Sequence, residues 1–152
     1  MANYPLPSNV GHIKPVSTNG TSAGLEIADS IPTGYSWVLL AVQHTLHKGG
    51  TGTPQVALQI CDSAGNPYLG PFLGCSGTQN VNTTVTYTWA PGLPLAANPW
   101  GSGTSFYSTA PLPHNLTLPG GHQIQTLTLN SVGGTSSYGT PSYFVCELGT
   151  GK

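Results

Sequence analysis

The segment NTTVTYTWA, residues 82–90, carries the pattern on which the fold prediction rests. Its apolar side chains are Val85, Tyr87 and Trp89, and threonines at positions 84, 86 and 88 alternate with them. A period of two residues is that of a β-strand, in which successive side chains point to opposite faces. Because one face is apolar and the other presents hydroxyl groups, the segment is predicted to be a half-buried strand.

Segments with strand character recur along the chain, and none shows a helical period or a capping box. They are LEIA (25–28), YSWVLLAVQHTLH (35–47), QVALQICD (55–62), YLGPFLGC (68–75), LPHNLTLPGGHQIQTLTLN (112–130, two halves around Pro-Gly-Gly) and SYFVCEL (142–148). Turns rich in Gly, Pro and Asn separate them. We therefore predict an all-β fold, an antiparallel β-sandwich of jelly-roll-like type.

The N-terminal segment has a different composition from the rest. Residues 1–24 alternate Pro, Asn, Gly, Ser and Thr with isolated apolar residues, which disfavours a helix. We predict an extended arm over residues 1–24 and a single domain over residues 25–152, a size that one core can support. The apolar residues of the arm, which could contact a partner, are Tyr4, Leu6, Val10, Ile13 and Val16.

The segment 35–47 is apolar on both phases of a strand. Trp37, Leu39 and Ala41 share one phase, and Val38, Leu40, Val42 and Leu46 share the other. Such a strand needs cover on both faces, either from a second sheet or from a neighbouring subunit. Trp37 and Leu39 are accordingly candidates for a subunit interface.

Residues 91–111, PGLPLAANPWGSGTSFYSTAP, are predicted to form a long irregular loop. Loops of more than about 15 residues are uncommon in compact domains and are usually functional or held by a partner. This loop contains Trp100, Phe106 and Tyr107, whose rings could stack on sugars. The alternative, which we favour, is that the rings pack beneath their own loop.

Charged residues make up 5% of the chain, with no Arg, three Lys and a net charge of −1, whereas an ordinary soluble domain has about 25%. A protein that binds nucleic acid needs a basic surface, so we expect that this chain does not bind nucleic acid. The longest apolar run, Trp37–Val42, has six residues, against about 20 for a membrane span. The N-terminus lacks the pattern of a secretory signal, so we expect synthesis in a cytosol.

The histidines do not suggest a metal site. His44 and His47 lie three residues apart on one predicted strand, so their side chains should point to opposite faces. His114 and His122 flank the Pro-Gly-Gly turn and could face each other across a hairpin, but no carboxylate accompanies them. No His-x-His of the cupin type occurs. We predict no metal and no cofactor.

Catalytic motifs are equally lacking. The four carboxylates, Glu26, Asp29, Asp62 and Glu147, show no spacing that marks an acid/base pair, and there is no nucleophile elbow or P-loop. The three cysteines have neither disulfide nor zinc spacing and are interpreted as small buried hydrophobes. We predict no catalytic residues and a protein that is not an enzyme.

The segments LTLPGGHQIQTLTLN (116–130) and SYFVCELG (142–149) resemble the closing strands of small jelly-roll virion proteins of tailed bacteriophages, in which Leu-x-Leu-Pro-(Ala/Gly)-Gly leads into an alternating strand. YSWVLLAVQHTL (35–46) is similar to their first long strand. The resemblance covers residues 25–149 in pattern. Members of this group include capsid decoration, or cement, proteins that sit as trimers on the capsid shell, and related folds serve in tails and fibres.

The resemblance implies a non-enzymatic virion protein, made in the cytoplasm of a bacterial host and located on the outer capsid surface. We expect a homotrimeric decoration protein that stabilises the head by bridging subunits of the major capsid protein through its arm and base. An uncharged polar surface suits this role, because it can be desolvated without the cost of burying unpaired charge. The alternatives are a receptor- or carbohydrate-binding module of a tail or fibre, and a minor capsid or vertex protein.

Overall fold

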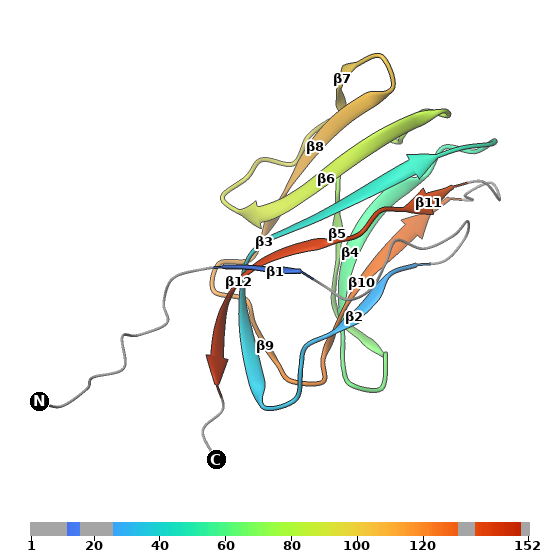
Figure 1. Ribbon diagram of the computed structural model, residues 1–152. Coiled ribbons are helices and arrows are strands. Elements are labelled where there is room, and N and C mark those ends of the chain that lie inside the picture. Colours follow the sequence, from blue (N-terminus) through green and yellow to red (C-terminus); the bar gives the residue numbers. More distant parts are fainter. Residues whose placement is uncertain (1–11, 16–25, 131–135, 150–152) are drawn as a thin grey trace, which may run out of the picture.

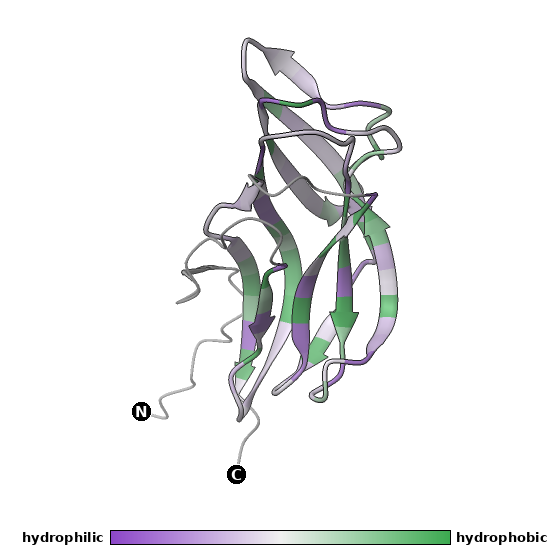
Figure 2. Cartoon of the chain, turned by 90° about the vertical axis from the view of Figure 1, so that its right-hand side faces the viewer, coloured by the Kyte–Doolittle hydropathy of each residue, from purple (hydrophilic) through white to green (hydrophobic). Residues whose placement is uncertain are grey.

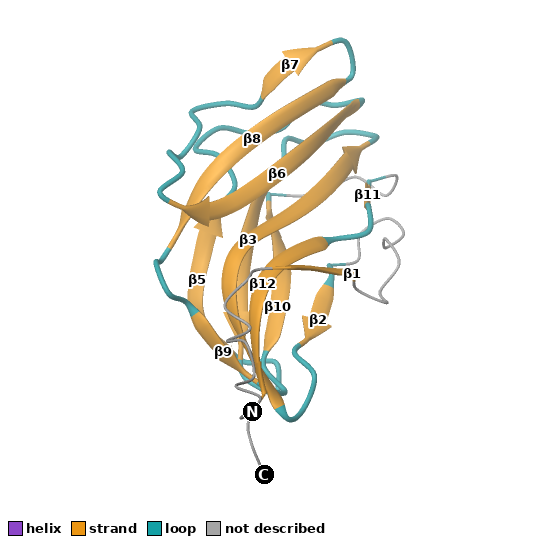
Figure 3. Ribbon diagram, turned by 60° about the vertical axis from the view of Figure 1, so that its left-hand side comes forward, coloured by secondary structure: helices purple, strands orange, loops and turns teal. Residues whose placement is uncertain are grey.

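A computed structural model describes residues 12–15, 26–130 and 136–149 of the chain. These residues form two β-sheets that pack face to face as a sandwich (Figure 1). Within the described ranges there is no helix (Figure 3). The prediction of an all-β sandwich is confirmed. Most of the predicted arm lies outside the described residues.

The larger sheet, sheet A, has the strand order β1-β12-β3-β6-β8-β7, with β9 and β11 also paired to β3. The smaller sheet, sheet B, has the order β2-β10-β4-β5. The strands are β1 (His12–Pro15), β2 (Ala28–Ser30), β3 (Tyr35–Lys48), β4 (Gln55–Cys61), β5 (Pro67–Leu73), β6 (Thr83–Pro91), β7 (Trp100–Ser102), β8 (Ser105–Leu112), β9 (Thr117–Pro119), β10 (Gln123–Leu129), β11 (Ser137–Tyr138) and β12 (Ser142–Gly149).

The chain passes repeatedly from one sheet to the other, as it does in jelly-roll-like sandwiches: β3 lies in sheet A, β4 in sheet B, β6 in sheet A and β10 in sheet B. One pair departs from the antiparallel expectation, because β6 and β8 run parallel. A parallel pair needs a connection of about a dozen residues or more to return the chain to its starting end. The segment between Pro91 and Ser105 does this, so the predicted loop 91–111 is partly strand: it contains β7 and most of β8.

The long strand β3 changes phase at its middle. Trp37 and Leu39 point into the sandwich before Leu40, and Val42, His44, Leu46 and Lys48 point inward after it. The pairing with β12 breaks at the same place, since Val145 faces Leu39 while Phe144 faces Ala41, which leaves Leu40 without a Cα partner on β12. Such a β-bulge adds one residue and reverses the alternation that follows.

The bulge corrects two predictions. Strand β3 is apolar on both phases mainly because the phase that points inward changes at the bulge, and not because both of its faces are covered. Trp37 is 4% and Leu39 0% exposed within the single chain, so the core of the sandwich covers them and neither is available to a subunit interface.

The core lies between the sheets and contains the apolar side of β6. Val85, Tyr87 and Trp89 are all buried, which confirms the alternation predicted for residues 82–90. The rings of Tyr87 and Trp89 lie 5.8 Å apart, and Trp89 Nε1 donates a hydrogen bond to Phe72 O of sheet B. Along the strands, apolar segments alternate with hydrophilic ones (Figure 2).

The stretch 112–130 does not form the hairpin predicted for it. β9 pairs with β3 in sheet A, whereas β10 pairs with β2 and β4 in sheet B, so the Pro-Gly-Gly segment is a crossover between sheets. The backbone is crowded there: a Cβ at Gly120 would lie 2.8 Å from Pro32 O. His114 and His122 therefore do not face each other across a hairpin. The ring of His122 packs instead against Tyr68, at a centroid distance of 5.5 Å.

Candidate binding surface on sheet A

The outer face of sheet A has a polar half, built by β3, β6, β8 and β7. Its side chains are Gln43, Thr45 and His47 of β3, Thr84, Thr86 and Thr88 of β6, Ser105, Tyr107 and Thr109 of β8, and Trp100 of β7. We call this set the polar half throughout. It carries no Lys, Arg, Asp or Glu.

Hydrogen bonds join three successive cross-strand pairs of the polar half. Gln43 Nε2 donates to Thr88 Oγ1 at 3.2 Å, and the Thr45 and Thr86 hydroxyls lie 3.2 Å apart. His47 Nδ1 and Thr84 Oγ1 lie 3.1 Å apart. Each pair is in direct register across β3 and β6. Cross-strand pairs of this kind stabilise a sheet and hold its surface groups in fixed positions.

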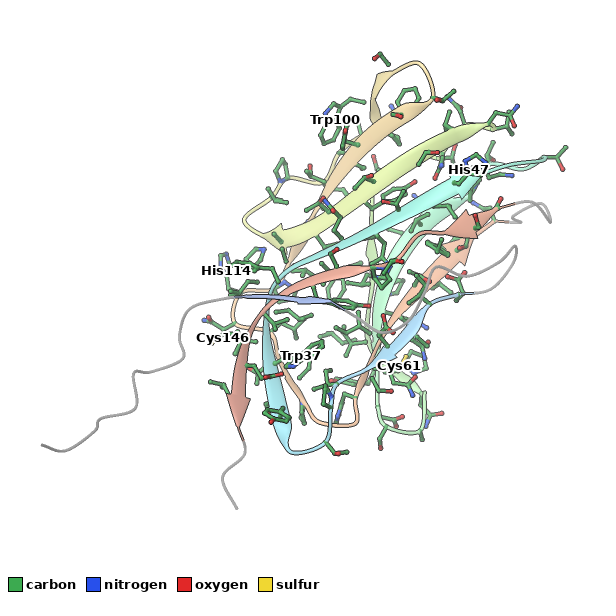
Figure 4. The ribbon with its side chains drawn as sticks, in the orientation of Figure 1. Trp37, His47, Cys61, Trp100, His114 and Cys146 are labelled. Atoms are coloured by element: carbon green, nitrogen blue, oxygen red, sulfur yellow. The ribbon has the colours of Figure 1, made fainter. Side chains whose placement is uncertain are left out.

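The aromatic side chains of the predicted loop lie at the far edge of this face. Trp100 and Tyr107 are register partners on β7 and β8, so their side chains share the outer face. They are 49% and 55% exposed, respectively. Figure 4 shows Trp100 at the β7 end of the sandwich, away from buried Trp37. The interpretation that we favoured, rings packed beneath their own loop, is wrong for these two residues.

Phe106 is separated from the other two aromatics. It is half-buried on the inner side of β8, next to Val85 in register. There it lines a hollow together with polar residues of the neighbouring loops. The lining residues are Thr78, Asn80, Thr83, Val85, Asn98, Pro99 and Phe106.

The same outer face has an apolar half, around and before the bulge. Phe144 and Leu148 of β12 are each 40% exposed. Their neighbours on β3, which are Val38, Leu40 and Ala41, are half-buried. These five residues with Cys146 are called the apolar half. An open hollow lies where the two halves meet, lined in part by Ala41, Gln43, Thr88 and Phe144.

The described surface is almost free of positive charge. Lys48 is fully buried, and its Nζ donates to the backbone oxygens of Gly49 and Thr51. The other two lysines are Lys14, whose side chain is not described, and Lys152, which lies outside the described residues. No arginine occurs in the chain.

All four carboxylates accept hydrogen bonds that hold the fold. Glu147 accepts from Trp37 Nε1 at 2.8 Å, and Asp29 accepts from Tyr143 Oη at 2.8 Å. Glu26 accepts from the Thr128 backbone N–H. Asp62 accepts from two backbone N–H groups of the turn before β5, and that from Asn66 contributes most to lowering the pKa of its carboxyl.

The two histidines of β3 point to opposite faces, as predicted. His47 is exposed, whereas His44 is buried among the rings of Trp89, Tyr138 and Tyr143. Burial lowers the pKa of His44 to about 3, and its Nδ1 has no hydrogen-bond partner within the described structure. In the described part of the chain, no three His, Cys, Asp or Glu side chains come together as a metal ion would need.

No disulfide joins the three cysteines, all of which lie in the described part of the chain. Cys61 and Cys75 are buried, in line with the prediction, but Cys146 is only half-buried on β12. Cys75 Sγ lies 3.1 Å from Gly77 O, and burial raises the pKa of its thiol. No helix long and apolar enough to cross a membrane occurs among the described residues.

Of the predicted contact residues of the arm, Ile13 alone lies in a described range of the chain. Tyr4, Leu6, Val10 and Val16 lie outside the described residues. Ile13 belongs to β1, which pairs antiparallel with the edge of β12 and places Ile13 opposite Phe144 in register. The arm therefore adjoins the apolar half at this one described point.

A scan against protein-family models, a search of curated proteins and a search of solved structures found no match to this chain.

Proposed function

We propose that this chain is a non-enzymatic structural protein of a bacteriophage virion, and specifically a capsid decoration protein that forms homotrimers and bridges subunits of the major capsid protein. The observation that carries the proposal is the apolar half of sheet A. It offers two exposed apolar side chains, Leu148 and Phe144, and Phe144 is in register with Ile13 of strand β1 in the arm. The resemblance of the C-terminal segments to jelly-roll virion proteins supports the same assignment.

The chemistry of this surface suits association between proteins. Exposed apolar patches rimmed by polar groups are typical of protein interaction sites. Covering Phe144 and Leu148 removes apolar area from water, which contributes about 25 cal/mol per Å². No charged side chain of the apolar half has to lose its hydration, so the usual penalty of several kcal/mol for burying an unpaired charge does not arise.

The use of the carboxylates supports a non-enzymatic role. Acid/base work on a substrate requires carboxylates that can exchange protons at an open site. Here Asp29 and Glu147 accept hydrogen bonds from buried aromatic side chains, and Glu26 and Asp62 accept hydrogen bonds from backbone N–H groups. These roles maintain the sandwich.

Size exclusion with light scattering, over a range of concentrations, tests the homotrimer. The expected mass is three times the 15.6 kDa of the chain. The double variant Phe144→Ser with Leu148→Ser should shift the mass toward the monomer. Tyr68→Ser is the matched control, because Tyr68 is 52% exposed on sheet B.

Co-sedimentation with empty capsids of the parent phage tests the bridging role. The full chain should pellet with capsids, and a chain that starts at Leu25 should pellet less. A chain that is monomeric at every concentration and stays in the supernatant with capsids would overturn the proposal.

A further inference from the structure

We propose that the polar half of sheet A is a binding site for a neutral polysaccharide chain, with Trp100 and Tyr107 as the residues that stack on sugar rings. This goes beyond the assembly role, which rests on the apolar half of the same face. The first observation is exposure: Trp100 and Tyr107 are two of the three most exposed aromatic side chains in the described structure. Their register pairing puts them side by side on one face.

The backbone that carries the aromatic pair is closely packed and hydrogen-bonded. Gly101 lies between Trp100 and Ser102 in a tight hairpin, and a Cβ there would come within 2.3 Å of Ser105 O. The close approach of β7 to β8 thus depends on the absence of a side chain at this position. The segment before Trp100 is also fixed, since Ala96 N donates to Thr109 O and Thr109 Oγ1 donates to Pro94 O. A site with little freedom to lose binds its ligand at a lower entropic cost.

Hydroxyl groups continue the site across the sheet. Tyr107 is in register with Thr86 of β6, and Thr86 is in register with Thr45 of β3. The row Trp100–Tyr107–Thr86–Thr45 therefore crosses four neighbouring strands (Figure 3), a length of about 14 Å at the usual strand spacing. This length fits an oligosaccharide segment better than a single sugar.

The two ends of the row match the two kinds of surface on a sugar. A pyranose ring has an apolar C–H face, which packs on an aromatic ring, and a rim of hydroxyl groups, which need hydrogen-bond partners. Thr45 and Thr86 supply hydroxyls that both donate and accept, and Gln43 adds an amide. Their mutual hydrogen bonds leave further lone pairs open to a ligand.

The lack of charge decides the class of ligand. Nucleic acids and acidic polysaccharides require cationic side chains to replace their counterions. The polar half has no Lys or Arg, and Lys48 at the end of β3 is buried. A protein partner would bury an apolar centre within a polar rim, whereas this half has hydroxyl groups at its centre and aromatic rings at its edge. A neutral glycan is the partner that fits both features.

Tryptophan fluorescence of the full chain gives a direct test. Of the three tryptophans, Trp37 and Trp89 are 4% and 0% exposed, so acrylamide quenching of the native protein reports on Trp100. The probes are dextran, yeast mannan, a mixed-linkage β-glucan and galactan, with polygalacturonate as the anionic counterpart. At least one neutral polysaccharide should protect Trp100 from quenching and shift its emission, and polygalacturonate should not.

Affinity electrophoresis in gels that contain the same polysaccharides identifies the residues. Trp100→Ala and Tyr107→Ala should each weaken binding by roughly tenfold or more, as expected for aromatic anchors. Tyr68→Ala, an equally exposed tyrosine on the other sheet, should bind like the wild type. Circular dichroism verifies that each variant is folded.

Three outcomes would overturn the proposal. The first is unchanged mobility and quenching with every neutral polysaccharide, and the second is binding of polygalacturonate alone. The third is binding that survives both aromatic variants but is lost in Phe106→Leu, which would move the site to the hollow on the inner side of β8. None of them depends on trimer formation or on capsid binding. The glycan site and the assembly role can therefore fail independently.

Discussion

The buried amide of Gln79 gives a sharp test of how the loop before β6 is held. Gln79 is 0% exposed, and its side chain is fully used: Nε2 donates to Leu46 O and Thr83 O, and Oε1 accepts from Tyr87 Oη at 3.0 Å. The amide thus connects this loop to β3 and β6. Tyr87→Phe removes one donor and leaves the shape of the ring unchanged.

The expected loss of stability in Tyr87→Phe follows from the buried polar atom that the substitution leaves without a partner. In Tyr87→Phe the Gln79 Oε1 atom stays buried without its donor, and a buried polar atom in that condition costs about 1–3 kcal/mol of the free energy of unfolding. For a chain of this size that lowers Tm by roughly 3–10 °C. Gln79→Leu should cost more, because it strands two backbone oxygens and the tyrosine hydroxyl together.

Urea unfolding followed by fluorescence measures these differences, with an unchanged m value showing that the unfolded state is unaffected. Tyr68→Phe is the control: Tyr68 is 52% exposed, so loss of its hydroxyl should change stability by less than about 0.5 kcal/mol. In the double variant, Tyr87→Phe should add little to Gln79→Leu, because the bond it removes is already gone. Equal stability of Tyr87→Phe and the wild type, within about 0.3 kcal/mol, would refute the reasoning.

Three further predictions concern the core, the buried histidine and the thiols. Trp89→Ala removes a fully buried indole and its hydrogen bond to Phe72 O, and should cost about 3–5 kcal/mol in urea unfolding; a loss below 1 kcal/mol would contradict the packing of β6 against sheet B. Burial lowers the pKa of His44 from 6.5 to about 3, so between these pH values the unfolded chain binds a proton that the folded chain does not. The free energy of unfolding should therefore fall as pH decreases through this range, by up to about 1.4 kcal/mol per pH unit. The slope should be smaller in His44→Leu. A thiol reagent such as DTNB should modify half-buried Cys146 in the native protein well before buried Cys61 and Cys75, an order that Cys146→Ser would identify by removing the fast phase.

Local alternation allowed much of the fold to be predicted from the sequence. In residues 82–90 a single phase is apolar, and that phase is the one buried on β6. The opposite orientations of His44 and His47 followed from strand geometry in the same way. Each of these predictions depends on neighbours within one strand, where the period of two residues is enforced by the backbone itself.

The errors arose where distant strands decide the conformation. The sequence of 112–130 looks like a hairpin, because two strand-like halves flank Pro-Gly-Gly, but β9 and β10 find their partners in different sheets. β6 and β8 pair in parallel because the segment between them returns the chain to the end at which β6 began. The alternation of residues within each strand does not reveal this direction. The outward position of Trp100 depends on the pairing of β7 with β8, which the sequence pattern does not reveal, so a packed loop is the sequence-based prediction for this aromatic edge.

The bulge at Leu40 shows how one residue sets both the core and the surface of sheet A. Before the bulge, Trp37 and Leu39 point inward and Val38 points out; after it, Val42 and His44 point inward. Had the first phase continued, Gln43, Thr45 and His47 would point into the core, and Val42, His44 and Leu46 would face water. That arrangement would bury polar groups and expose apolar ones, each at a cost of the order of 1–3 kcal/mol.

The division of the outer face follows from the same bulge. From Val38 to Ala41, around the bulge, the outward side chains of β3 are apolar and lie beside Cys146 and Phe144 of β12. From Gln43 to His47 the outward side chains are polar and bond to the threonines of β6. Two surfaces of different chemistry thus lie side by side on one sheet, so the proposed association between copies and the proposed glycan binding would use different residues of the same face.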